Sequence, residues 1–216
     1  MKLTSLIEVV GRRIRSLGAV AGRAAALPVG DFDRERLTTF LTIDLLNLNT
    51  EWIRRYYISV SMNEALKRNG KKIIIGRKHQ SAEDAISYAI DKINGADAKS
   101  RWIARPTRFF EPSWASVNTL PLLANMLNFP DKHTISTSIS AGRDAITTLQ
   151  AARNYYAHRN VESREALSDQ LEAMLGWRTF ESPSIEILNR RIGAFSNIFS
   201  FWLDDSERVN REVCDL

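Results

Sequence analysis

The chain has 216 residues, of which 44% are hydrophobic and 25% are charged, and its formal net charge is +5. These values are ordinary for a globular protein, and the length suits one domain with extensions or two small domains. No run of about 18 apolar residues occurs, which excludes a membrane-spanning helix. The single cysteine, Cys214, excludes a disulfide framework and is typical of a reducing compartment. We therefore expect a cytoplasmic protein with no membrane partner.

The charge is unevenly distributed along the sequence. Residues 67–108 hold 11 Lys and Arg against 4 Asp and Glu, whereas residues 162–216 hold 6 against 11. A basic segment of this kind is compatible with a nucleic-acid partner.

The first 30 residues predict a basic amphipathic helix. Apolar side chains recur at steps of three and four from Leu3 to Ala26, and Pro28 and Gly30 then end the pattern. The arginines of this segment and its alanine tail also resemble an export signal. Because Arg23 would interrupt the apolar part of such a signal, we favour the helix.

The middle of the chain predicts one long helix and then a less regular region. Asp31 or Asp33 offers an N-cap for a helix that ends near Gly70. The only strand-like run, 71–76, is interpreted as a loop or edge segment, because one short strand makes no sheet. Ser81 is expected to cap a helix that ends near Asn94, and residues 96–112 look like a loop. We accordingly describe 67–112 as a basic, loop-rich insert.

The last hundred residues predict further helices. One begins at Ser113 and runs toward Leu127, limited or kinked by Pro121. A second covers about 140–160, a third follows Ser163 and a fourth begins at Pro183 and is expected to pass residue 202. The fold class is therefore all-α, a single-domain bundle of six or seven helices over 1–216.

The segment 153–160, Arg-Asn-Tyr-Tyr-Ala-His-Arg-Asn, carries the clearest chemistry. At about 100° per residue, a helix places Asn154 and His158 on one side, together with Thr147 and Ala151. The opposite stripe, which should face the core, holds Ala145, Leu149, Ala152 and Tyr156.

Asn154 and His158 are four residues apart, so the amide can orient the imidazole. Arg153 lies on the flank and can offer a planar fork to phosphate oxygens. An imidazole and a guanidinium beside a phosphodiester can move a proton and stabilise charge at phosphorus without a metal ion.

The sequence Arg153-Asn154-x-x-Ala157-His158 resembles the Arg-x-x-x-x-His signature of the HEPN superfamily. The resemblance implies an α-helical bundle and a metal-independent endoribonuclease of the toxin or phage-defence type. It also implies a homodimer in which two motif helices form one composite site. Arg153 and His158 would be catalytic, and Asn154 would support them.

One departure from the pattern has a consequence for regulation. Some toxins of this superfamily carry a tyrosine two positions after the histidine, which a partner nucleotidyltransferase modifies. Asn160 stands there in this chain, so we do not expect that form of silencing. An antitoxin or another regulatory protein remains an expected partner.

Two further interpretations of the motif stay open. The chain could be a non-catalytic HEPN domain that binds RNA or protein and dimerises, or a helical regulatory or scaffold protein with a coincidental motif. In the second case His158 would be an ordinary helix C-terminal histidine.

Other candidate residues concern RNA binding and metals. Basic and aromatic residues alternate between 99 and 110, as expected for an RNA contact, although Trp102 and Phe109 could instead fold back onto the bundle. His79 and His133 are expected to be solvated loop residues. No metal-ligand spacing occurs, so we predict no metal and no cofactor. The predicted RNA-binding residues are Arg101, Trp102, Arg105, Arg108, Tyr155 and Arg159.

Overall fold

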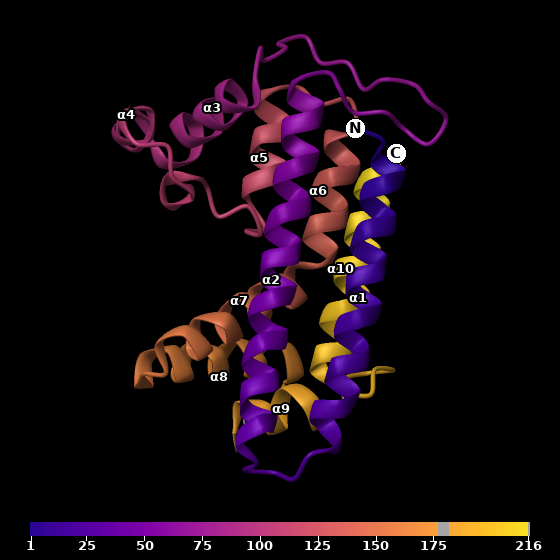
Figure 1. Cartoon of the computed structure of the whole chain (residues 1–216), viewed down its shortest axis with the longest axis vertical. Helices are drawn as coiled ribbons and strands as arrows, with labels where there is room; N and C mark the ends of the chain where they lie inside the picture. Colours follow the sequence, from indigo (N-terminus) through magenta and orange to yellow (C-terminus); the bar gives the residue numbers. More distant parts are fainter. Residues whose placement is uncertain (177–181, 216) are drawn as a thin grey trace. The chain divides into compact units, whose positions relative to one another are not determined.

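The structure, a computed structural model, describes residues 1–176 and 182–215. Over this range it contains ten α-helices, one 3₁₀ helix and no strand, which confirms the all-α class, with more helices than the six or seven expected (Figure 1). The elements are α1 (Leu3–Ala26), α2 (Phe32–Ser61), α3 (Ala82–Asn94), α4 (Ala96–Ala104), η1 (Arg108–Phe110), α5 (Thr119–Met126), α6 (Lys132–Ala141), α7 (Arg143–His158), α8 (Val161–Leu175), α9 (Pro183–Asn189) and α10 (Ile198–Cys214). None of the helices in the described part has the length and apolar character needed to cross a membrane.

The chain groups into two compact units, each built from separate segments. Unit 1 comprises Met1–Glu8, Asn49–Ala141 and Asn210–Leu216. Unit 2 comprises Val9–Leu48 and Gly142–Val209. The helices α1, α2 and α10 each contribute residues to both units.

In unit 1 the start of the chain is fixed by the segment that follows α2. The amino group of Met1 donates to the carbonyl of Glu64 at 2.6 Å, and the amide of Leu3 donates to the carbonyl of Leu66 at 3.0 Å. Leu66 also forms an isolated bridge with Lys72. The strand-like run 71–76 is therefore bridged locally without forming a strand, as the sequence predicted.

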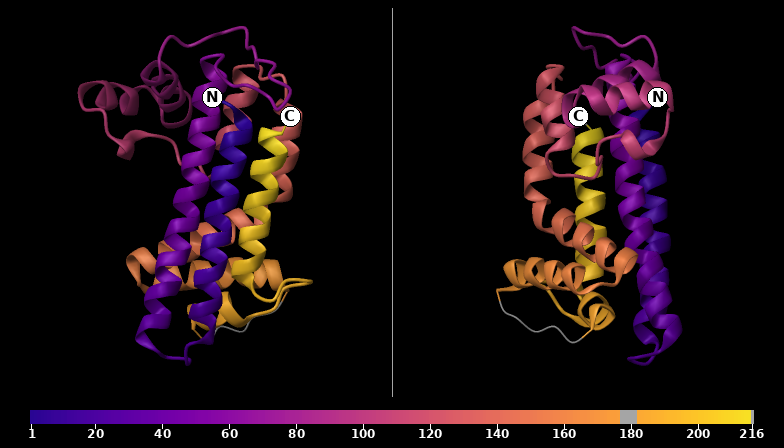
Figure 2. Two further views of the ribbon diagram at one scale, coloured as in Figure 1. Left: turned by 45° about the vertical axis from the view of Figure 1, so that its right-hand side comes forward. Right: turned by 90° about the vertical axis from the view of Figure 1, so that its left-hand side faces the viewer.

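Several boundaries in unit 1 differ from the prediction. The long helix α2 ends at Ser61 rather than near Gly70, because Asn63 adopts a left-handed conformation and its amide oxygen accepts from the backbone of Ile75 at 2.9 Å. Residues 96–104, expected to be loop, form α4. The helix predicted from Ser113 begins only at Thr119, and α6, which follows it, was missed. Figures 1 and 2 show α5 and α6 side by side.

In unit 2 a buried arginine connects the end of α1 to α2 and α9. Arg34 is almost fully buried, and its guanidinium donates to the carbonyls of Ala25 and Leu27 and to the side chain of Asn189. These three acceptors compensate most of the buried guanidinium, of which only Nε has no hydrogen-bond partner among the described residues. The helix expected from Pro183 past residue 202 is instead two helices, α9 and α10, with residues 190–197 between them.

Gly142 permits the close approach of α10 to the start of α7. A methyl group in its place would overlap the Asp205 carboxylate and lie 3.0 Å from Val209. We expect Gly142→Ala to lower the free energy of unfolding by about 1–3 kcal/mol, as is usual for overpacking. Urea titration of this variant should show the decrease. Gly22→Ala, where the added methyl meets nothing within 4 Å, should not lower the free energy of unfolding and should raise it slightly, because alanine is favoured over glycine inside a helix.

The single thiol is a probe of unit 1. Cys214 is fully buried at the end of α10, and burial, with a smaller contribution from Asp215, raises its pKa above the ordinary thiol value. Because the thiolate is the reactive form, the folded protein should react with a disulfide reagent at neutral pH far more slowly than the urea-unfolded chain. Equal rates in the two states would contradict this placement.

Candidate functional site

The two faces of α7 follow the predicted pattern. Ala145, Thr148, Leu149, Ala152 and Tyr156 are buried, which confirms the expected core stripe. Burial raises the pKa of the Tyr156 phenol, whose oxygen has no hydrogen-bond partner among the described residues. Trp202 of α10 donates to the Thr148 hydroxyl at 2.8 Å and so helps to fix this helix in unit 2.

The exposed face of α7 forms one wall of an open groove of about 730 Å³, and α8 forms the other. Figures 1 and 2 show these helices side by side. Asn154 and His158 line the groove together with Thr147 and Ala151, as the helical spacing predicted. The imidazole is exposed to solvent at the last residue of α7.

The connection between α7 and α8 is a tight corner. Arg159 is left-handed, with φ of 50°, and its amide donates to Tyr155 at 2.7 Å, which closes α7. Asn160 then caps α8 by accepting from the amide of Ser163 at 2.9 Å. The predicted N-cap, Ser163, is thus replaced by Asn160, and α8 starts three residues after His158.

Arg153 lies outside the lining of the groove and contacts its neighbour on the helix. Its guanidinium donates to the side-chain oxygen of Asn154 at 3.2 Å. Within the described residues, no hydrogen bond joins Asn154 to His158. The structure thus pairs the amide with the guanidinium, whereas the sequence had suggested pairing with the imidazole.

The side chains that line the groove carry negative rather than positive charge. Its acidic lining residues, Glu162 and Asp169, both come from α8, and no Lys or Arg is among the described residues that line it. Asp169 has a polar or electrostatic partner of its own. Carboxylates oppose the approach of a phosphodiester, so the wall of α8 does not by itself favour RNA.

The other residues predicted to bind RNA belong to two different units. Arg101 and Arg105 are exposed on and just after α4 in unit 1, whereas Tyr155 and Arg159 belong to unit 2. Tyr155 is half-buried against Tyr156, and Arg159 donates to the hydroxyl of Thr39 at 3.3 Å.

Two side chains that were predicted to contact RNA instead contact other residues of unit 1. Trp102 is buried against Ile86 and Ile90 of α3, so it is unavailable for base stacking. Arg108 donates to the carboxylate of Glu51 at 2.9 Å. Sequence reasoning left open whether Trp102 and Phe109 fold back; the former does, whereas Phe109 is exposed.

The other histidines differ from each other. His79, expected to be solvated, is buried; one ring nitrogen lies 3.1 Å from the carboxylate of Asp84, and the ring packs against Tyr88. That prediction was wrong, because the loop after residue 76 folds onto the start of α3. His133 is exposed, as expected, but it lies in α6 rather than in a loop, and it lines an open groove between α5 and α6. Among residues 1–176 and 182–215, no three His, Cys, Asp or Glu side chains are grouped so that they could hold a metal ion.

A scan against protein-family models, a search of curated proteins and a search of solved structures each returned no match.

Proposed function

We propose that the protein is a metal-independent endoribonuclease whose site is the exposed end of α7. The observation that carries the proposal is the placement of His158 and Asn154 side by side on a solvent-open groove, with the Arg153 guanidinium 3.2 Å from the Asn154 amide oxygen. An accessible imidazole, with a guanidinium five residues earlier on the flank of the same helix, supplies a proton carrier and an anion-binding fork.

The reaction that these groups favour is internal transfer at phosphorus. His158 takes the proton of a ribose 2′-hydroxyl, the 2′-oxygen forms a bond to phosphorus, and the bond from phosphorus to the 5′-oxygen breaks. The leaving 5′-oxygen receives a proton from a second acid. Arg153 binds the non-bridging oxygens, on which negative charge increases in the transition state. The products are a 2′,3′-cyclic phosphate and a 5′-hydroxyl.

A second copy of the chain would supply the second acid and the positive charge that this reaction requires. One imidazole serves as base or as acid but not as both at once, and the acidic wall of α8 leaves the groove short of positive charge. Two-fold pairing of the motif helices would bring a second His158 and a second Arg153 to the same phosphodiester. The homodimer expected from the sequence is therefore part of the proposal, as is a toxin or defence role restrained by an antitoxin.

The alternative is a non-catalytic protein that uses this groove to bind another protein. The two carboxylates on α8 favour it, since they suit a basic partner better than a phosphate. On this alternative, Glu162→Gln would weaken the partner complex. On the nuclease proposal, the same change would leave cleavage in place or increase it.

The test uses the purified wild-type chain beside His158→Ala, incubated with a mixture of end-labelled RNAs. Wild type should cleave in excess EDTA and leave 2′,3′-cyclic phosphate or 3′-phosphate ends, and His158→Ala should not. Cleavage that disappears with EDTA and returns with Mg²⁺ would disprove the mechanism. If wild type cleaves none of the RNAs, the non-catalytic alternative is favoured.

A further inference from the structure

Phe109 is the most exposed large hydrophobic side chain of the described residues, at 87%. It is the middle residue of η1, which follows α4 in unit 1. An apolar ring held this far in water contributes nothing to the core. Its neighbour Phe110 does contribute, since it packs against the cluster of Ile86, Ile90 and Trp102. The two rings meet edge to face, with centroids 5.3 Å apart.

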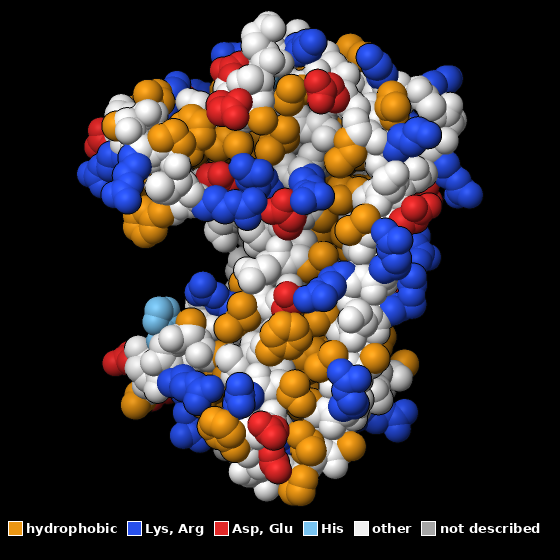
Figure 3. All heavy atoms as spheres, in the orientation of Figure 1, with side chains coloured by type: hydrophobic (Ala, Val, Ile, Leu, Met, Phe, Trp, Pro, Cys, Tyr) orange, Lys and Arg blue, Asp and Glu red, His pale blue; other side chains and the backbone are white. Residues whose placement is uncertain are grey.

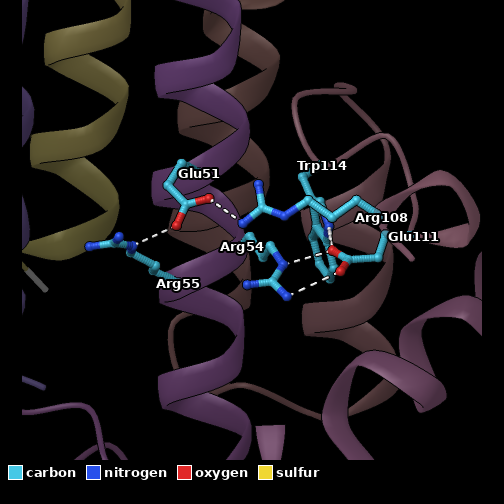
Figure 4. A network of polar contacts seen from close by, with 6 residues as sticks. All are labelled: Glu51, Arg54, Arg55, Arg108, Glu111 and Trp114. Atoms are coloured by element: carbon cyan, nitrogen blue, oxygen red, sulfur yellow. Dashed lines mark hydrogen bonds and ion pairs between the residues drawn. The ribbon is translucent and has the colours of Figure 1, made fainter. Parts of the chain in front are cut away.

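The turn that presents Phe109 is fixed on both sides. The side chain of Asn94 donates to the carbonyl of Phe110 at 2.9 Å. Glu111 is bound by Arg54 through two hydrogen bonds, of 2.7 and 3.1 Å, and by the indole of Trp114 at 2.8 Å (Figure 4). The ring is thus exposed on a preorganised turn, so little conformational entropy is lost when a ligand stacks on it.

The helix α4, which contacts η1, carries positive charge that no acidic side chain of the described residues neutralises. No described acidic side chain pairs with Lys99, Arg101 or Arg105, and Asp97 is the only acid on α4. In Figure 3, Lys and Arg side chains gather with hydrophobic ones over the part of unit 1 where α4 lies. Trp102, between these cations in sequence, faces the core and anchors the helix that carries them.

We propose that α4 and η1 form a platform for single-stranded RNA, on which an unpaired base stacks on Phe109 while Arg101 and Arg105 bind the flanking phosphates. The choice of RNA rests on the proposed function. The single-stranded class follows from the ring, because a base exposes its face only when it is unpaired and unstacked. Duplex RNA would offer the cations its phosphates but give Phe109 nothing to stack on.

Binding is tested with the full chain carrying His158→Ala, so that cleavage does not interfere. A short fluorescent single-stranded RNA is compared with the same RNA in a duplex. Phe109→Leu should weaken single-strand binding about tenfold and leave duplex binding unchanged, whereas Phe109→Trp should retain both. Phe32→Leu is the matched control, because Phe32 is also exposed, at 73%, but belongs to unit 2.

The salt dependence of binding tests the role of Arg101 and Arg105. Replacing Arg101 and Arg105 with Gln should make the dependence of log K on log salt shallower by about 0.7 for each phosphate that the variant no longer neutralises. An unchanged slope, or a Phe109→Leu variant that binds single strands like wild type, would overturn the platform.

Ile103 distinguishes the platform from a lipid-binding surface. It is 61% exposed on α4, and an aliphatic side chain inserts into lipid but does not stack on bases. Ile103→Ser should leave RNA binding unchanged. If Ile103→Ser and Phe109→Ser both abolish binding to vesicles of phosphatidylserine and phosphatidylcholine, and RNA binding is unaffected, the surface binds membranes and the proposal is wrong.

The platform and the nuclease can fail separately. Loss of cleavage in His158→Ala with normal RNA binding in Phe109→Leu would refute the platform and leave the nuclease. Single-strand binding that depends on Phe109, in a wild-type protein that cuts no RNA, would refute the nuclease and support the platform.

Discussion

Replacing Arg153 with lysine should lower kcat for RNA cleavage roughly 100-fold or more, although the charge is kept. Lysine is a point charge, whereas the planar guanidinium can bind two phosphate oxygens at once and still reach the Asn154 amide, to which it donates at 3.2 Å. If the fork acts on the transition state, its loss is comparable to the removal of a preorganised donor. Arg153→Ala should then be about as inactive as Arg153→Lys. Single-turnover cleavage at saturating protein isolates this step from binding.

Arg143→Lys is the matched control, since it makes the same change at the exposed first residue of α7. It should cleave at the wild-type rate. If Arg153→Lys also cleaves at that rate while His158→Ala is inactive, Arg153 has a structural role and the assignment is wrong. If His158→Ala is also fully active, the site lies elsewhere in the chain.

Breaking the ion pair between Arg54 and Glu111 should strongly lower the free energy of unfolding of unit 1. The two side chains are largely buried, at 19% and 6% exposure, and the carboxylate accepts two hydrogen bonds from Arg54 and one from Trp114 (Figure 4). Glu111→Leu leaves the guanidinium without its partner. Removing one member of such a pair typically lowers the free energy of unfolding by about 3–5 kcal/mol. Urea unfolding followed by tryptophan fluorescence measures the loss.

Two further variants test whether the loss of stability comes from the buried ion pair. Arg55→Gln removes a half-exposed pair on the same helix and should cost less than about 1 kcal/mol. The double variant Arg54→Met with Glu111→Leu should recover much of the loss, because no uncompensated charge remains. A double variant as unstable as Glu111→Leu alone would mean that Glu111 stabilises unit 1 through its hydrogen bond from Trp114 instead of through Arg54.

The nearby carboxylate of Glu51 should make the free energy of unfolding depend on pH. Burial alone raises the pKa of Glu51, but hydrogen bonds and charge from Arg55 and Arg108 outweigh it, so the pKa lies below its ordinary value (Figure 4). A lowered pKa stabilises the fold above the unfolded-state value and ceases to do so as the pH falls through the folded-state value. Unfolding measured from about pH 7 to about pH 3 should therefore show a loss that is smaller in Glu51→Gln.

Periodicity was sufficient to predict the parts of the fold in which one face of a long helix is apolar. The helix α1 has the predicted limits, and on α7 both the buried stripe and the exposed face of Asn154 and His158 were foreseen. These assignments depend only on residues three and four apart.

The errors arose where particular side-chain contacts, rather than helical periodicity, decide the local structure. The end of α2 depends on Asn63 reaching Ile75, and the burial of His79 depends on Asp84 and Tyr88. The helix α4 looked like a loop because it is only nine residues long, and its stability depends on Trp102 packing against α3. The pairing of Arg153 with Asn154 was missed because spacing places side chains on faces without choosing their partners.

Unit 1 is built from both ends of the sequence, so it can be completed during synthesis only after unit 2. It takes its first residues from Met1–Glu8 and its last from Asn210 onward, whereas unit 2 has all of its residues once Val209 is made. Cys214, fully buried, is among the late residues. A nascent chain therefore carries the amphipathic start of α1 with part of its packing still missing until the residues from Asn210 onward have been made. During that interval the apolar face of this segment is available to chaperones, and a chain that lacks the residues from Asn210 onward lacks part of the core of unit 1.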